Sequence, residues 1–209
     1  MDGFELVEEL LPEYDVCDGV ATVVHADAAH TWAALMDADL VALGRRRPLV
    51  GVLGAARALP ELALQVCRGR GVPRPPTQLR LRDTTELAAP DGGWIMLGER
   101  PGEEIVLGLV GQFWRPVIRY ATVDAAGFCE FAEPGYAKTL YALAVRPTGP
   151  DRTLLAAVMR TATTDERARR WFHRYWTLGV GSGAHVLVGA LLDAVRDDAE
   201  RSQRVPVTA

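Results

Sequence analysis

The chain has 209 residues, of which 49% are hydrophobic and 24% are charged, and its formal net charge is −4. A length not far above the ~150-residue average of one domain predicts a single domain over residues 1–209, with a short flexible tail from about residue 202. Because acids and bases are interspersed along the chain, a nucleic-acid-binding protein is excluded as the default class. The arginines around residues 167–174 form a local basic cluster.

The cysteines and the first residues predict a cytoplasmic protein. Cys17, Cys67 and Cys129 are too far apart in sequence for a zinc motif or a redox pair, so we expect reduced, buried thiols. The segment Met1–Glu9 carries acids where a secretory signal would need bases and an apolar stretch. No metal and no cofactor are expected, because the four histidines show none of the spacings of a metal site.

One apolar stretch, Leu178–Val195, approaches the length of a membrane-spanning helix. It contains four glycines as well as Ser182, His185 and Asp193. We therefore expect an amphipathic helix with a broken start, and no integral membrane span.

The first third of the chain reads as one strand followed by helical segments. Alternating side chains predict a half-buried strand over Tyr14–His25. Asp27 stands where a helix N-cap is expected, before a helix that contains Trp32. Short helical pieces interrupted by two prolines are expected over residues 39–66, and an extended proline-rich loop over residues 70–76.

Beyond that loop the hydrophobic period becomes alternating, which predicts antiparallel strands. The expected elements, in order, are an alternating segment over Leu79–Asp83, a hairpin of Trp94–Arg100 and Glu104–Trp114 around Pro101-Gly102, a short helix over Asp124–Ala132, a second hairpin of Tyr136–Arg146 and Arg152–Thr163, and a long helix from Thr164 or Asp165 to Ser202.

Local segments support a comparison with a known family. These are VHADAA over Val24–Ala29 followed by WAAL over Trp32–Leu35, GERPGEE over Gly98–Glu104 and GLVGQFW over Gly108–Trp114. Together with the element order they resemble the START/Bet v 1-like superfamily (SRPBCC, polyketide cyclase-like), in its uncharacterised bacterial members; Asp27 replaces the usual proline. The resemblance implies an α+β helix-grip fold, in which a curved antiparallel sheet wraps a long C-terminal helix and two short helical segments follow the first strand.

The same resemblance implies an apolar cavity between the sheet and the C-terminal helix. Eight large or flexible side chains are suited to line it, although they could instead fill the core: Trp94, Met96, Phe113, Tyr141, Met159, Trp171, Tyr175 and Trp176. If the cavity were catalytic, Glu99, Tyr141, Arg160 and His173 would be the candidates for acid, base or positioning roles. Against this, Glu99 adjoins a hairpin turn and His173 sits among arginines, which is typical of solvated groups.

The segment Gly179–Gly183 interrupts the last helix. It does not follow a strand within a βαβ unit, so a phosphate-binding loop is excluded. Two interpretations stay open, namely a hinge that lets part of the helix lift from the cavity and a kink that allows close packing on the sheet.

The function that these features favour is binding of a hydrophobic small molecule, such as a lipid, a polyketide or a related metabolite, by a monomer or homodimer. A polyketide cyclase or aromatase-like enzyme and a protein-interaction module of co-chaperone type are the alternatives. The sequence contains no motif of a catalytic nucleophile, so the case for an enzyme rests on the family resemblance.

Overall fold

The computed structural model describes residues 4–46, 80–85 and 93–204. The elements, in chain order, are α1 (Glu5–Leu10), β1 (Val16–Val24), α2 (Ala28–Asp37), α3 (Leu40–Arg46), the 3-10 helix η1 (Leu81–Thr85), β2 (Ile95–Arg100), β3 (Glu104–Gly111), α5 (Ala125–Glu130), β4 (Ala137–Gly149), β5 (Arg152–Thr163), α6 (Glu166–Tyr175), the π-helical turn η2 (Trp176–Val180) and α7 (Gly181–Arg204).

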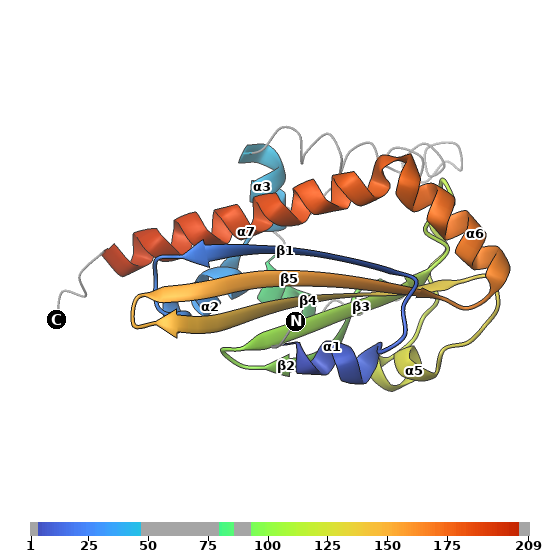
Figure 1. The fold of residues 1–209 in the computed structure, drawn as a ribbon, viewed down its shortest axis with the longest axis horizontal. Coiled ribbons are helices and arrows are strands. Elements are labelled where there is room, and N and C mark those ends of the chain that lie inside the picture. The colour runs from blue at the N-terminus through green and yellow to red at the C-terminus, as the bar shows by residue number, and fades with distance from the viewer. Residues whose placement is uncertain (1–3, 47–79, 86–92, 205–209) are drawn as a thin grey trace.

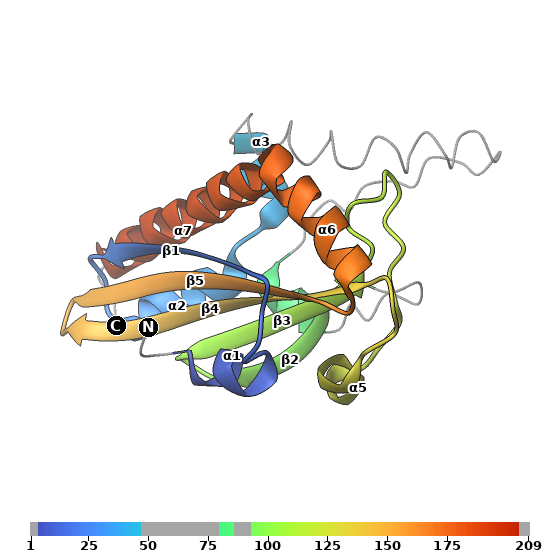
Figure 2. The ribbon, with the colours of Figure 1, turned by 45° about the vertical axis from the view of Figure 1, so that its right-hand side comes forward.

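The strands form one antiparallel five-stranded sheet in the order β1-β5-β4-β3-β2. Helix α7 lies along one face of this sheet, and α2 and α3 lie beside it on the same face (Figure 1). Helices α1 and α5 lie on the other face (Figure 2). The observed architecture is the predicted α+β arrangement, with two short helices directly after the first strand.

The alternation of side chains along the strands supplies apolar groups to both faces. Leu107, Leu143 and Leu155 point into the core under α7. Val106 and Leu140 point into a second core under α1 and α5. Successive side chains in a strand point to opposite faces, so a strand is buried along its whole length only when both faces are covered. This is the case for β3, in which every residue is buried.

Three helices begin at the predicted aspartates. The carboxylate of Asp27 accepts a hydrogen bond from the backbone N–H of His30 at 2.8 Å. Asp124 and Asp165 cap α5 and α6 in the same way, at 2.7 Å in each case. A carboxylate at this position satisfies an N–H that has no partner inside the helix. Both predicted hairpins and these helix starts are therefore confirmed.

The described residues differ from the sequence expectations at η1 and at α1. Leu81–Thr85 is a 3-10 helix and not a strand, since the Asp83 N–H closes a turn on the Arg80 carbonyl at 3.1 Å. Helix α1 was not predicted, because six residues are too few to show a helical period. The C-terminal helix is broken near Gly179, in agreement with the predicted broken start, and it extends to Arg204, while the tail from about residue 202 stays a prediction. The helical pieces after Arg46, the proline-rich loop and Cys67 lie outside the described residues.

The break between α6 and α7 has a clear local cause. Gly179 adopts φ +104°, a left-handed conformation that other residues rarely take. Two residues later, a Cβ on Gly181 would lie 2.6 Å from the indole ring of Trp176, so this position requires glycine for close packing. The chain therefore changes direction at η2, and α6 leaves the line of α7 (Figure 1).

By length and composition alone, the helical stretch Glu166–Arg204 could cross a membrane. Such a test is also passed by core helices of soluble proteins. Leu192 and Val195 of this stretch are buried in the core against the sheet. The predicted absence of an integral span and the predicted cytoplasmic location stay predictions.

Candidate functional site

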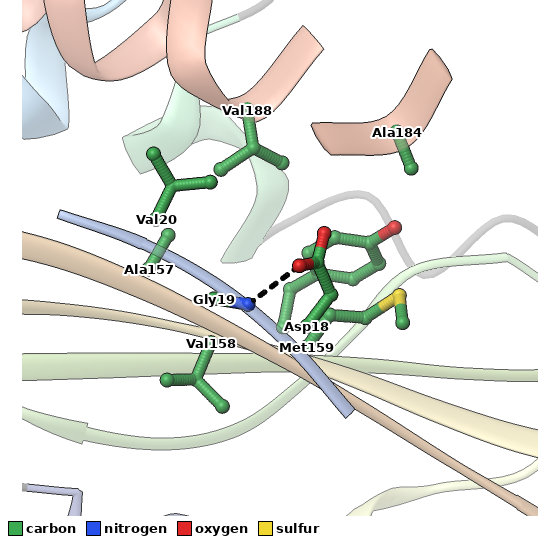
Figure 3. A pocket seen from close by; sticks show the side chains of 9 residues that line it. Asp18, Gly19, Val20, Ala157, Val158, Met159, Ala184 and Val188 are labelled. Carbon is green, nitrogen blue, oxygen red and sulfur yellow. Dashed lines mark hydrogen bonds between the residues drawn. The ribbon is translucent and has the colours of Figure 1, made fainter. Parts of the chain in front are cut away.

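A small pocket lies between the N-terminal half of α7 and the sheet. Figure 3 shows Val188 of α7 directed at Val20 and Ala157 of the sheet, while Ala184 lies farther along the helix. The cavity volume is about 10 Å³, which is the space of about one water molecule. In this structure, α7 is thus packed nearly in contact with the sheet.

The strand register brings three side chains of the pocket into one row. Asp18 on β1 pairs with Met159 on β5, and Met159 pairs with Tyr141 on β4. Directly paired residues of an antiparallel sheet present their side chains on the same face. The row therefore places a carboxylate and a phenol on either side of a thioether, under α7.

Tyr141 carries the most perturbed group of the pocket. Burial, followed by the charges of Tyr175 and Asp18, raises its pKa to about 12. The phenol therefore stays protonated at neutral pH and can donate a hydrogen bond. Within the described part of the chain, no residue accepts this hydrogen bond. An apolar pocket thus contains a hydrogen-bond donor without a protein acceptor.

Asp18 joins the pocket to α7 through an imidazole. Nδ1 of His185 lies 3.1 Å and 3.0 Å from the two carboxylate oxygens of Asp18. Oδ1 of Asp18 also accepts a hydrogen bond from the backbone N–H of Gly19 at 2.9 Å (Figure 3). A carboxylate on Nδ1 fixes the ring's orientation and tautomer. This pair was missed by the sequence reasoning, although an aspartate at an inward position between Val16 and Val20 was a usable signal.

The predicted lining residues fall into three groups. Tyr141 and Met159 line the pocket. Trp94 packs edge to face on Tyr141, with 5.5 Å between the ring centroids, and Met96 packs against the adjoining core. Phe113, Tyr175 and Trp176 gather around Phe172 in a separate aromatic cluster. Trp171 lies on the outer side of α6, 47% exposed, with the Arg174 guanidinium over its ring. The structure thus brings only part of the predicted set together.

Among the four catalytic candidates, Tyr141 alone lines the pocket. Arg160 neighbours Met159 on β5 and therefore points to the opposite face, where its guanidinium binds the Glu8 carboxylate and the Leu11 carbonyl of the α1 region. His173 is exposed and lines an open groove between α6 and the start of β1. These two residues do not share a site with Tyr141.

Glu99 shows how a bulge changes the face of a side chain. The alternation predicted Glu99 on the same face as Leu97, opposite Met96. A bulge between Met96 and Gly98 inserts one residue, so Glu99 pairs with Ile105 and shares the face of Met96. It is nevertheless exposed, on the edge strand β2.

The thiols and possible metal ligands were also located. Cys17 is half-buried and Cys129 is exposed, so the prediction of a buried thiol is wrong for Cys129. In residues 4–46, 80–85 and 93–204, no group of three His, Cys, Asp or Glu side chains is arranged to hold a metal ion.

Replacing Tyr141 by phenylalanine should change the alkaline limb of the stability curve. The pKa of Tyr141 is about 12 in the folded protein and about 10 in the unfolded chain. The stability that the neutral phenol contributes is therefore fully present below pH 10 and is lost as the pH rises from 10 to 12. Across that window the wild type should lose about 2 kcal/mol more than Tyr141→Phe. Urea unfolding at a series of pH values measures this, with Tyr120→Phe, at an exposed position, as the control. Parallel curves for wild type and Tyr141→Phe would contradict the assignment.

No family model matches the sequence, and no curated protein matches it. Solved structures with which it can be superposed include a conserved protein from Geobacillus kaustophilus, at 12% sequence identity and a TM-score of 0.42, over 90% of this chain and 98% of that one. A hypothetical protein from Helicobacter pylori superposes at 10% identity and a TM-score of 0.45, over 95% of this chain and 97% of that one. The Zhui aromatase/cyclase from Streptomyces superposes at 14% identity and a TM-score of 0.35, over 93% of this chain and 99% of that one.

The chain has a helix-grip fold. This statement rests on its own sheet order and on the placement of α7 against one face of that sheet. At the identities and TM-scores of the superposed structures, the likeness carries no argument about activity.

Proposed function

We propose that this protein binds a hydrophobic small molecule, of the lipid or polyketide kind, between α7 and the sheet. The observation that carries the proposal is the Tyr141 hydroxyl, a protonated donor beside an apolar gap, with no acceptor among the described residues. A ligand that covers this hydroxyl would leave it without a partner, at a cost of about 1–3 kcal/mol, unless a ligand oxygen accepts its hydrogen bond. The ligand should therefore carry a carbonyl, hydroxyl or similar group at this point.

Binding requires α7 to move, because the gap now holds about one water molecule. Ala184 and Val188, which form the helical side of the gap, follow the break at Gly179. Because the break uncouples α7 from α6, the first turns of α7 would lift from the sheet by a tilt about Leu192 and Val195, which stay in the core. We therefore place the hinge at Gly179 and the close-packed contact at Gly181, so that both interpretations of the glycine segment apply, to different residues.

The second candidate is an enzyme of the polyketide cyclase or aromatase kind. It is favoured by the Asp18–His185 pair, since Asp18 lines the pocket together with Tyr141 and an imidazole oriented by a carboxylate can exchange protons with a bound molecule. The two candidates differ in one respect. Asp18→Asn should leave ligand binding in place and abolish conversion if the protein is an enzyme, and should change neither if it only binds.

Ligand binding at this site is tested by filling the gap. The probe is anilinonaphthalene sulfonate, an apolar aromatic molecule with acceptor oxygens, added to the full-length protein. We expect saturable binding of one equivalent, abolished in Ala184→Phe and weakened about tenfold in Tyr141→Phe, which is the effect of one lost hydrogen bond. Native mass spectrometry of the purified protein should show a co-purified species that Ala184→Phe lacks.

The matched control is Gly189→Ala on the same helix, where a Cβ meets nothing within 4 Å. It should bind like the wild type and be slightly more stable, because alanine favours the helix. Circular dichroism and thermal unfolding establish that each variant is folded. Unchanged binding in a folded Ala184→Phe would overturn the proposal.

A further inference from the structure

The outward side of α6 carries an ordered set of cations. Arg167, Arg170 and Arg174 are spaced so that they project from one side of the helix, and Trp171 lies beside them. All are exposed, since α6 packs on the sheet through Ala168 and Phe172 on its other side. The guanidinium of Arg174 lies 5.6 Å from the centre of the Trp171 ring. A basic and aromatic face therefore points to solvent.

The protein neutralises these cations only in part, since the Arg167 charge acts on the Asp165 carboxylate without forming an ion pair with it. Among the described residues, Arg167 and Arg174 form no ion pair, and Arg170 reaches only Glu166, at 4.0 Å. Arg169, on the adjoining side, is neutralised by Asp15 at 2.7 Å and by Glu166 at 2.9 Å. The helix thus presents a surplus of positive charge on a protein whose net charge is −4.

An open groove adjoins this face. Its volume is about 510 Å³, and its lining consists of Val16 and Phe172, the basic side chains Arg169, Arg170, His173 and Arg174, and Asp15. The one acid of the groove is the partner of Arg169. The groove therefore suits an anionic group.

Two large apolar side chains project next to the cations. Leu178 is 85% exposed at the break that follows α6, and Trp171 is 47% exposed. Tryptophan and leucine beside arginines are typical of helices that lie at the boundary between lipid headgroups and acyl chains. Tryptophan and arginine are also enriched in protein interfaces, so an acidic protein partner is the alternative that the test below must distinguish.

We propose that α6 and the adjoining break form a docking surface for an anionic lipid bilayer. Arg167, Arg170 and Arg174 lie over the lipid phosphates, and Trp171 and Leu178 enter the headgroup region. The arginines supply the electrostatic attraction, and the apolar pair supplies the hydrophobic contact. The surface is independent of the pocket, because none of its residues lines the gap under α7.

The test is co-sedimentation of the full-length protein with vesicles of phosphatidylcholine alone or mixed with phosphatidylglycerol. Binding is expected only to the mixed vesicles, and it should weaken as salt is added. The triple variant Arg167→Gln, Arg170→Gln, Arg174→Gln should bind about 100-fold more weakly, since each arginine near an anionic surface contributes roughly a fivefold factor. Leu178→Ser should weaken binding about tenfold, and Trp171→Phe should remove part of the fluorescence shift on binding.

The control removes the same number of positive charges at the far end of the molecule. Arg152→Gln, Arg201→Gln, Arg204→Gln removes three exposed arginines and should leave vesicle binding within threefold of the wild type. Equal losses in the two triple variants would mean that net charge alone acts, and would overturn the proposal. Binding to polyglutamate but not to the mixed vesicles would also overturn it, in favour of an acidic protein partner.

Discussion

Phe128→Ala should lower the free energy of unfolding by about 3–5 kcal/mol. Phe128 is fully buried on α5, and its ring packs against Val106, Val110 and Leu140 on the face opposite α7. The ring approaches the sheet closely because Gly108 lacks a side chain, since a Cβ there would lie 3.1 Å from it. Alanine would leave a cavity that the surrounding strands cannot close. Urea unfolding measures the loss.

The matched control for this prediction is Phe131→Ala. Phe131 is half-buried at the end of the same helix, so its removal should cost about 1–2 kcal/mol. Because Phe128 lies on the other face of the sheet from the pocket, the folded fraction of Phe128→Ala should still bind the naphthalene probe. A loss below 1 kcal/mol would show that α5 is not held by this ring.

Arg160→Met should lower the free energy of unfolding by about 3 kcal/mol and leave ligand binding unchanged. The buried guanidinium donates to the Leu11 carbonyl and to the Glu8 carboxylate at 3.1 Å each, and it lies 4.5 Å from the centre of the Tyr14 ring. Methionine preserves the packing of the side-chain stem and removes only these polar contacts, each of which is worth about 1.5–3 kcal/mol when a charge takes part. Denaturant unfolding measures the first outcome, and probe titration measures the second.

The pH dependence of the same contact has a defined sign. The hydrogen bond from Arg160 lowers the pKa of Glu8 below its ordinary 4.5, so its stabilising effect is present above that value and is lost as the pH falls through the lowered pKa. This acid sensitivity should be absent in Arg160→Met. The control Arg152→Met, at an exposed position of the same strand, should change stability by less than about 0.5 kcal/mol. Loss of probe binding in a folded Arg160→Met would place Arg160 in the ligand site after all.

Signals confined to a few neighbouring residues were predictable. The aspartate caps of α2, α5 and α6 act on backbone groups three residues away, so their effect can be deduced from the sequence. The turn at Pro101-Gly102 is equally local, since Gly102 adopts φ +82°. Both hairpins followed from such turns and from the alternation on either side.

Features that depend on strand partners were not predictable. Whether a side chain faces α7 depends on register, and one bulge beside Met96 reversed the expected face of Glu99. The residues that flank Tyr141 in the pocket come from three other elements, and Asp18 and His185 are 167 positions apart in sequence. No local pattern links them.

The sequence by itself determined the α+β class, the element order and most helix starts, because these follow from hydrophobic period, capping and turn residues. The tertiary structure decided which residues form the site. It placed Tyr141 and Met159 under α7, turned Arg160 to the opposite face, and left Trp171 in solvent on α6. The physical reason is that a pocket is made by strand pairing and helix packing between distant segments, and these depend on how the whole chain buries its apolar surface.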